Sequence, residues 1–512
     1  MSNKTALISC WDKAGVVELA RSLADSNWEI ISTGGTAKHL LEAEIPVTSV
    51  EDVTGYPSLL GGRVKTLHPA LHAGILARRD LPQDVEELID AGFRSIDLVA
   101  VNLYPFEKTI SAGADMNEAL ENIDIGGVTL LRAAAKNWPS VLVLCDPQDY
   151  PEFAGRLRNG EIGEDFRRRM AAKAFGQTAR YDALITSYLA GDDDLPAERA
   201  LPVQRRRLLR YGENPHQTAA LYSHPDGSGF DIGDFEQLGG PDLSYNNFVD
   251  LDAAVDVVRE FQRTAVCAVK HTNPCGVAVG GDVAETFYRA YLGDRVSIYG
   301  GVIACNDTVS EAMVDRIREI GLFLEVMVAP DYAPAALEKL ARRKKLRVLK
   351  LGSEAWSRPE SYTVGRFLRG GLMMGSGDSD TVSPQDWRVA GQHQPDEELL
   401  EDAYFAWRVC KHAKSNAIVL AKSEMTLGVG AGQMNRVSSA RLALEAAGKE
   451  ARGAVMASDG FLPFPDVVQL AAEAEVRLLV QPGGSIRDDE VIAAADEAGM
   501  VMMFTGRRHF KH

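Results

Sequence analysis

The chain has 512 residues, of which 46% are hydrophobic and 25% charged, a composition typical of soluble proteins with more than one core. Its net charge of −17 excludes a general nucleic-acid-binding surface, so any phosphate should bind in a local site built from backbone groups. Six cysteines without a CxxC pair, a non-secretory N-terminus and no apolar run near the ~18 residues of a membrane span predict a reduced, cytoplasmic protein without disulfides or a zinc ribbon.

The N-terminal part of the chain alternates predicted strands and helices. Ala6–Ser9 and Glu29–Ser32 are short apolar strands, and apolar side chains between them recur at the spacing of a helix. Residues 96–101 and 141–144 are continuous apolar runs, which is typical of buried parallel strands. The sequence therefore predicts a doubly wound α/β domain over residues 1–195.

Four polar loops of this domain carry residue types that suit a phosphorylated ring. They are 33–36 (TGGT), 61–69 (GGRVKTLHP), 102–106 (NLYPF) and 123–129 (IDIGGVT). Three of them follow a predicted strand, and ligands of open parallel sheets bind beyond the carboxyl ends of the strands. Glycines let backbone N–H groups approach a phosphate, and a helix N-terminus adds partial positive charge. Each loop alone is most simply a turn or a helix cap, but together they predict one binding crevice.

A second α/β region begins after an acidic, proline-containing run, Gly191–Pro196, and covers residues 200–512. Within it, 270–279 (KHTNPCGVAV) and 411–420 (KHAKSNAIVL) resemble each other. Both place Lys-His before a predicted turn and an apolar strand. The similarity is short and gives weak support to two similar subdomains.

Lys270 and His271 end a β-prone segment, and Pro274 and Gly276 predict a turn directly after them. A histidine near its neutral pKa can accept a proton from a weak nucleophile, while a nearby ammonium stabilises developing negative charge. The alternative is a solvated pair at a strand end. His412 is predicted to lie on a helix without such a turn, and we do not expect it to be catalytic.

The segments LISCWDKAG, STGGTAKHL, GGRVKTLHPALHAGIL, NLYPF and IDIGGVTLLRAAAKN resemble the inosine monophosphate (IMP) cyclohydrolase domain of bifunctional purine-biosynthesis enzymes. The following region resembles their other activity, 5-aminoimidazole-4-carboxamide ribonucleotide (AICAR) formyltransferase. The resemblance runs from residue 4 to the C-terminus. It implies a methylglyoxal-synthase-like first domain and two cytidine-deaminase-like subdomains after it. It also implies a homodimer whose protomers share the formyltransferase site, without nucleic-acid or membrane partners.

For the first domain, the resemblance implies binding of the ribose phosphate of formylated AICAR and ring closure with loss of water. The reaction is intramolecular, so orientation supplies much of the acceleration. The residues implied in catalysis are Lys65, Tyr104, Asp124 and Lys136. The implied substrate contacts are Ser9, Lys13, Thr33, Gly34, Gly35, Thr36, Arg63, Thr66, Asn102, Gly126 and Gly127. Trp11 departs from the pattern, which has a tyrosine or a smaller polar residue there.

For the second region, the resemblance implies that His271 accepts a proton from the AICAR amine as it attacks the formyl group of 10-formyltetrahydrofolate. Lys270 and Asn416 would stabilise the oxyanion or assist the leaving nitrogen. The implied nucleotide contacts are Arg210, Tyr211, Asn247, Gly300, Glu325 and Arg508. The implied folate platform is Phe461, Pro463 and Phe464, with Asp466 or Asp459 at the polar edge of the pterin.

Three alternatives compete with this interpretation. A zinc nucleoside deaminase needs a PCxxC motif, but no second cysteine follows Pro274-Cys275, so no metal is expected. A lyase that uses only the methylglyoxal-synthase-like fold would leave the second region unexplained. A non-catalytic protein that senses purine nucleotides would be expected to lose Lys136, Lys270 or His271, and all three are present.

Overall fold

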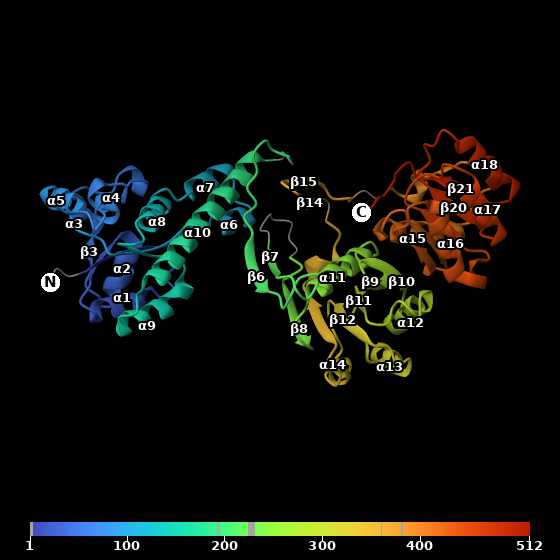
Figure 1. Ribbon diagram of the computed structural model, residues 1–512, viewed down its shortest axis with the longest axis horizontal. Helices are drawn as coiled ribbons and strands as arrows, with labels where there is room; N and C mark the ends of the chain where they lie inside the picture. The colour runs from blue at the N-terminus through green and yellow to red at the C-terminus, as the bar shows by residue number, and fades with distance from the viewer. Residues whose placement is uncertain (1–3, 192, 194, 224–230, 360, 380–381) are drawn as a thin grey trace. The chain divides into compact units, whose positions relative to one another are not determined.

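The computed structural model describes residues 4–191, 193, 195–223, 231–359, 361–379 and 382–512. The chain forms two compact units, which meet in the sequence between Val203 and Gln204 (Figure 1). The sequence-based boundary was placed at 195–200. Among the described residues, no helix combines the length and the apolar character needed to cross a membrane.

The first unit contains a five-stranded sheet in the order β3-β2-β1-β4-β5. Its strands are β1 (Thr5–Cys10), β2 (Glu29–Ser32), β3 (Thr48–Ser49), β4 (Leu98–Asn102) and β5 (Leu142–Leu144). Every neighbouring pair is parallel, and central β1 aligns Ala6 with Ile30 of β2 and Leu98 of β4. The predicted doubly wound α/β fold is therefore confirmed.

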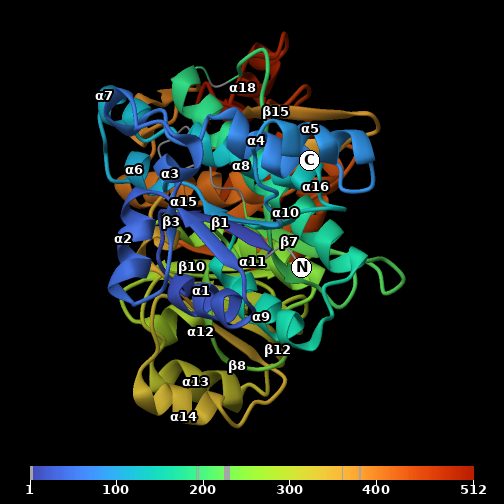
Figure 2. The same ribbon diagram turned by 90° about the vertical axis from the view of Figure 1, so that its left-hand side faces the viewer.

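Helices cover both faces of this sheet, with α1 and α2 on one side and α8 and α10 on the other (Figure 2). The helices of the unit are α1 (Val16–Asp25), α2 (Gly34–Glu42), α3 (Val50–Thr54), α4 (Pro69–Leu76), α5 (Pro82–Asp90), α6 (Phe106–Ser111), α7 (Met116–Glu121), α8 (Gly126–Lys136), α9 (Tyr150–Asn159) and α10 (Glu164–Ala190). Helix α1 buries Val16, Leu19, Ala20 and Leu23, the residues whose spacing predicted it. This packing leaves the carboxyl ends of β1, β2 and β4 next to polar loops.

The second unit contains a twelve-stranded sheet built from two halves with the same strand order. The first half consists of β8 (Phe235–Gly239), α11 (Tyr245–Val258), β9 (Thr264–Lys270), β10 (Asn273–Gly280), α12 (Val283–Gly293), β11 (Gly301–Cys305), α13 (Glu311–Glu319), β12 (Leu324–Ala329), α14 (Pro334–Leu340) and β13 (Arg347–Leu351). The second consists of β16 (Arg388–Val389), α15 (Glu397–His412), β17 (Ile418–Lys422), β18 (Met425–Gly430), α16 (Arg436–Ala447), β19 (Val455–Ser458), α17 (Asp466–Glu473), β20 (Leu478–Gln481), α18 (Asp488–Glu497) and β21 (Val501–Phe504). Two hairpins lie outside the sheet, β6 (Gln204–Leu208) with β7 (Ala220–Ser223) and β14 (Thr363–Leu368) with β15 (Gly371–Ser376).

The repeat of two similar subdomains is therefore confirmed, but the sequence similarity that suggested it pairs non-equivalent positions. Lys270 ends β9, whereas Lys411 lies near the end of α15. The element of the first half that corresponds to α15 is α11, since each precedes the first strand of its antiparallel pair. The two Lys-His pairs therefore lie in different kinds of element. His412 lies on a helix, as predicted.

The turn after Lys270 differs from the prediction. The two-residue turn between β9 and β10 is His271-Thr272, because Asn273 already pairs with Lys270. Pro274 and Gly276 lie within β10, where the register shifts. A Cβ atom at Gly276 would lie 2.1 Å from the carbonyl oxygen of Ala290 on α12. The glycine is therefore needed for close helix packing and does not form the turn.

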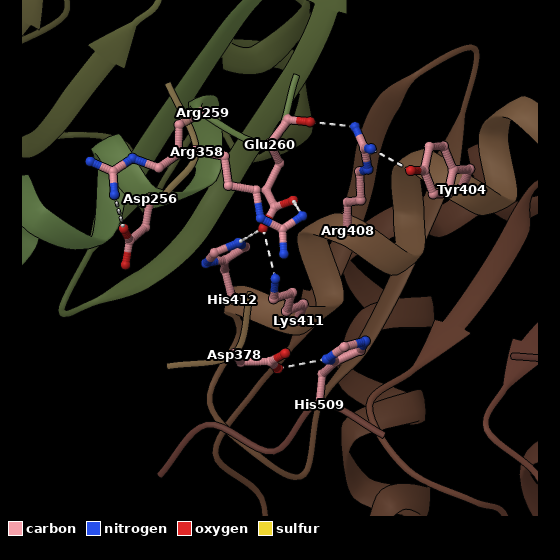
Figure 3. A network of polar contacts seen from close by, with 10 residues as sticks. All are labelled: Asp256, Arg259, Glu260, Arg358, Asp378, Tyr404, Arg408, Lys411, His412 and His509. Atoms are coloured by element: carbon pink, nitrogen blue, oxygen red, sulfur yellow. Dashed lines mark hydrogen bonds and ion pairs between the residues drawn. The ribbon is translucent and has the colours of Figure 1, made fainter. Parts of the chain in front are cut away.

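A buried ionic network joins the two halves (Figure 3). Glu260, whose side chain is 3% exposed, follows α11 in the first half. Its Oε1 accepts hydrogen bonds from Lys411 Nζ at 3.0 Å and His412 Nε2 at 2.9 Å, and its Oε2 accepts one from Arg358 at 3.0 Å. Arg408 also donates to the backbone oxygen of Glu260. The end of α15 is thereby fixed to the end of α11.

Candidate active sites

The first candidate site lies where β1, β2 and β4 end. Ser9 Oγ and Thr33 Oγ1 are 2.9 Å apart. Thr36 Oγ1 donates to the carbonyl oxygen of Cys10 at 2.9 Å and accepts from Lys13 Nζ at 3.1 Å. The structure therefore brings together the predicted phosphate contacts that follow β1 and the TGGT loop that opens α2. Hydroxyl groups, an ammonium and the positive end of a helix dipole suit an anion.

Lys13 is held at this site from two sides. Its Nζ also contacts the carbonyl oxygen of Cys10, at the end of β1. Burial lowers the pKa of Lys13, and the neighbouring Cys10 and Asp12 oppose that shift. Lys13 is half-buried, and an ammonium that is partly shielded from water interacts more strongly with a bound anion than a fully exposed one does.

Lys65 reaches the same loop from the GGRVKTLHP segment. A Cβ atom at Gly34, whose φ is +37°, would lie 3.3 Å from Lys65 Nζ. Glycine at this position therefore accommodates both the backbone conformation and the lysine. Arg63, in contrast, forms an ion pair with Glu121 in this conformation.

The IDIGG loop completes this site. Thr66 is buried, and a Cβ atom at Gly126 would lie 2.6 Å from its Oγ1. Asp124 Oδ1 accepts a hydrogen bond from the backbone of Gly127 at 2.7 Å. Burial raises the pKa of Asp124, against the lowering effect of backbone hydrogen bonds from Gly127 and Tyr104. Tyr104 is 47% exposed.

Lys136 lies at the far end of the helix that the IDIGG loop opens. It is the last residue of α8, and Gly126 is the first. At 1.5 Å of rise per residue, Lys136 lies roughly 15 Å along the helix axis from Gly126.

Asn102 and Trp11 form the edge of the site. The Asn102 side chain accepts from the backbone N–H of Asp12 at 2.8 Å and donates to the carbonyl oxygen of Asp12 at 2.9 Å. Both polar atoms of the side chain thus hold the loop that follows β1. The Trp11 side chain is 47% exposed, while its backbone N–H donates to the Asn102 carbonyl oxygen at 3.5 Å. The backbone at position 11 is thus bonded to the end of β4.

The second candidate site surrounds Lys270. Its Nζ donates to the carbonyl oxygens of Gly300, at 2.9 Å, and Tyr299, at 3.2 Å. Gly300 has a φ of +69°, and a Cβ atom there would lie 3.2 Å from Lys270 Nζ. The structure thus brings together two predicted site residues that are separated by a helix and a loop in the sequence.

The His271 turn meets the loop that carries Asn416. Asn273 Nδ2 donates to the His271 carbonyl oxygen at 3.2 Å, and Asn273 Oδ1 accepts from the backbone of Lys414 at 2.9 Å. Asn416 Nδ2 in turn donates to the Gln433 carbonyl oxygen at 2.8 Å. The His271 side chain is exposed. The exposed imidazole and the Asn416 loop therefore belong to one surface, contributed by both halves of the unit.

Two predicted nucleotide contacts bond each other directly, and an arginine that the sequence reasoning missed bonds one of them. Asn247 is buried, and its Nδ2 donates to Glu325 Oε2 at 3.3 Å. Arg347 Nη1 donates to the same oxygen at 3.1 Å. Arg347 begins a buried strand. An arginine next to an apolar run was the only feature of the sequence that could have indicated its role. Arg210, whose guanidinium lies 5.4 Å from the centre of the Tyr211 ring, is exposed.

The predicted folate platform offers two exposed aromatic side chains, Phe461 (39%) and Phe464 (47%), with Pro463 between them. Of the two candidate aspartates, Asp459 is 2% exposed, and its carboxylate accepts from Arg436 at 2.8 Å and Ser415 at 2.5 Å. Asp466 opens α17 and is half-buried. Asp466 Oδ1 accepts only the backbone N–H of Val467, at 2.8 Å, among the hydrogen bonds of the described residues.

The C-terminal residues are packed against this half. His509 is 3% exposed, and its Nδ1 lies 2.6 Å from Asp378 Oδ2. Arg508 is exposed, with its guanidinium 4.8 Å from the centre of the Phe510 ring. Throughout the described part of the chain, no group of three or more His, Cys, Asp or Glu side chains is arranged to hold a metal ion.

Comparisons with known proteins match both units. The model of the "AICARFT/IMPCHase bienzyme" family matches residues 134–446, and that of the "MGS-like domain" matches residues 15–129. A protein of Anoxybacillus flavithermus (strain DSM 21510 / WK1) named "Bifunctional purine biosynthesis protein PurH" is 48% identical over 513 residues, which cover 99% of this chain and 100% of that protein. A protein of the same name from Bacillus cereus (strain AH820) is 47% identical over 514 residues, with the same coverage. The solved "Crystal structure of ForH" is 36% identical and covers 36% of this chain and 98% of that chain, with a TM-score of 0.33.

Proposed function

The chain belongs to the AICARFT/IMPCHase bienzyme family, and from this premise we propose how its side chains divide the chemistry. It is a bifunctional purine-biosynthesis enzyme. One activity transfers a formyl group to the 5-amine of AICAR, and the other closes the formylated product to IMP with loss of water. A nucleotide-sensing protein without catalysis is not supported by these relatives.

The unit that ends at Val203 is proposed to close the ring. The ribose phosphate would bind at the N-terminus of α2, between the Thr33 and Thr36 hydroxyls and the ammonium groups of Lys13 and Lys65. The carboxamide nitrogen then attacks the formyl carbon of the same molecule. The site holds the carboxamide nitrogen against the formyl carbon, so the two groups do not have to meet by diffusion. This orientation accounts for a large part of the acceleration.

Proton transfers during ring closure are proposed for Asp124 and Tyr104. A carboxyl group with a raised pKa holds a proton more readily than an ordinary aspartate, so it can accept a proton during the attack on the formyl carbon and return it as water leaves. The Tyr104 backbone already contacts this carboxylate, and the hydroxyl of this exposed residue would reach a ligand there. Lys136, the last residue of α8, is proposed as a third participant in these proton transfers.

The unit from Gln204 onwards is proposed to transfer the formyl group. The AICAR amine is weakly nucleophilic, so His271 accepts its proton as it attacks the formyl carbon. Lys270, with Asn416 beside the turn, stabilises the oxyanion that forms. Asn247 and Glu325 contact the nucleotide, in line with their direct hydrogen bond. Arg210, Tyr211, Gly300 and Arg508 are proposed as further nucleotide contacts.

The formyl donor is proposed to be 10-formyltetrahydrofolate. Its pterin would lie against Phe461, Pro463 and Phe464, with Asp466 at its polar edge. No metal ion enters the proposed mechanism. We further propose a cytoplasmic homodimer in which both protomers complete the formyltransferase site. Six free cysteines, all in described segments and five of them buried, are consistent with a reducing compartment.

The observation that most supports this proposal is the junction of the His271 turn with the Asn416 loop through Asn273 and Lys414. The test is to mix purified protein with AICAR and 10-formyltetrahydrofolate and to follow tetrahydrofolate and IMP together. We expect both products. His271→Ala should abolish tetrahydrofolate formation but still convert added formyl-AICAR to IMP. Full turnover by His271→Ala would contradict the assignment of the base.

A further inference from the structure

The turn that carries His271 adopts a backbone conformation that its sequence disfavours. His271 and Thr272 have φ angles of +52° and +64°. Two-residue hairpin turns with positive φ at both positions are normally formed by asparagine and glycine. A β-branched threonine is among the least suited residues for that region. Some other contact must therefore offset the strain.

One side chain outside the hairpin binds this turn directly. Asp250 Oδ1 accepts a hydrogen bond from the backbone N–H of Thr272 at 2.7 Å. Asp250 lies on α11 and is half-buried. A carboxylate acceptor makes a stronger bond than a neutral group. The turn is also supported by a hydrogen bond from Asn273 Nδ2 to the His271 carbonyl oxygen, at 3.2 Å.

The position of Asp250 on α11 links the turn to the nucleotide contacts. Asn247 lies three residues earlier, one helical turn away, and residues at this spacing share a helix face. Asn247 is buried and bound to Glu325, so this part of α11 is fixed in place. A single rigid helix thus holds both a proposed nucleotide contact and the turn with the proposed base.

We propose that Asp250 is a positioning residue for formyl transfer, which holds the His271-Thr272 turn so that the imidazole faces the nucleotide amine. This inference rests on the function proposed above for His271. Asp250 does not touch the reacting atoms; it acts through the Thr272 backbone. Its loss frees the turn to relax towards negative φ, which moves the imidazole away from the amine.

The test compares Asp250→Ala with Asp250→Asn in the full-length enzyme. We expect Asp250→Ala to lower kcat for formyl transfer by about 10- to 100-fold, because a shift near 1 Å at a catalytic group costs up to that factor. KM for AICAR should change by less than about threefold, since ground-state binding is kept. Asp250→Asn, which retains an oxygen acceptor, should lose less. Cyclohydrolase activity, which resides in the other unit, should stay unchanged and reports that the unit up to Val203 is folded, while the far-UV circular dichroism spectrum reports on the unit that carries Asp250.

A second substitution separates positioning from a merely structural role. Glycine adopts positive φ without strain, so Thr272→Gly added to Asp250→Ala should restore much of kcat. The matched control is Asp282→Ala, which removes another carboxylate bond to a backbone N–H, from Glu285 at 2.9 Å in the same unit. This control should leave formyl transfer unchanged.

Three results would overturn the inference: a wild-type kcat in Asp250→Ala, a loss that appears only in KM, or no recovery on adding Thr272→Gly. Should Asp250→Ala not fold, the same comparison is made with Asp250→Asn, alone and with Thr272→Gly. His271→Ala separates the proposed role of His271 as the base from the proposed role of Asp250 in positioning it. If it retains formyl transfer, the proposed function of His271 fails; if it is inactive while Asp250→Ala is fully active, only the role of Asp250 fails.

Discussion

Replacing Glu260 by glutamine should strongly destabilise the second unit. The carboxylate is 3% exposed and is bound by Lys411, whose side chain is 5% exposed, and by His412 and Arg358. Glutamine keeps the shape but removes the charge, which leaves the Lys411 ammonium buried without its anion. Removing one partner of a buried ion pair costs about 3–5 kcal/mol. We expect a value near the lower limit, about 3 kcal/mol, because the glutamine oxygen can still accept one hydrogen bond.

Urea unfolding measures this change. A unit of this size has an m value of roughly 3 kcal/mol/M, so the unfolding midpoint of the second unit should fall by about 1 M. Formyltransferase activity and tryptophan fluorescence report on it, since Trp407 is buried in the helix that carries Lys411. The matched control is Glu424→Gln, because Glu424 pairs with an Arg263 side chain that is 60% exposed. An exposed pair contributes at most about 1 kcal/mol.

Acid should reduce the difference between Glu260→Gln and the wild type. Burial raises the pKa of Glu260, but the hydrogen bond from His412 and the charges of His412, Lys411 and Arg358 outweigh it and hold the pKa well below its usual range. A carboxyl group with a lowered folded pKa contributes stability above its unfolded pKa, 4.5, which is lost as pH falls below that value. A loss below about 1 kcal/mol at neutral pH, or a difference that does not shrink in acid, would refute this reasoning.

Three further predictions concern the two sites. Gly127→Ala places a Cβ atom 2.5 Å from Asp124 Oδ2 and should lower cyclohydrolase kcat by about 100-fold while formyl transfer, measured in the same preparation, is unaffected. With Asp124 as the base, ring closure should lose activity in acid at a pH above 3.8, because burial raises the pKa of this carboxyl group. A kcat–pH profile whose acid limb is unchanged in Asp124→Asn would exclude Asp124 as the base. Gly300→Ala and Gly321→Ala both force alanine to a φ of +69°, but only the first meets a neighbour, Lys270 Nζ at 3.2 Å, so only Gly300→Ala should lower formyltransferase kcat; equal losses would show a general backbone effect.

The sequence predicted the parts of this fold that depend on local patterns. Strands such as Glu29–Ser32 and the buried face of α1 follow directly from apolar spacing. The TGGT segment was placed correctly between a strand and a helix, because glycine and threonine are typical of turns and of helix N-termini. Loops at the carboxyl ends of parallel strands converge by topology alone, so four weak motifs could be assembled into one site.

The remaining errors and omissions come from contacts between distant residues. Proline and glycine predicted a turn at 274–276, but the carbonyl oxygen of Ala290 decides the role of Gly276. Arg347 bonds to Glu325, and Asp250 bonds to the backbone of Thr272. In each pair the two residues are 22 positions apart in the sequence. No local pattern encodes such pairs. The equivalent elements of the two halves are identified by their order in the chain and in the sheet, and not by the similar Lys-His segments.

The seam between those halves has a consequence for the solubility of fragments. Strands β10 and β18 pair antiparallel at the centre of the sheet, with Ala278 opposite Met425. The outer limits of the sheet are β8 and the two-residue β16, both short and antiparallel to their neighbours. Cutting the unit into halves would expose two longer, largely apolar edge strands with unpaired backbone groups. Such edges recruit other chains, so either half expressed alone should aggregate, and the duplicated architecture stays soluble only while both copies are joined.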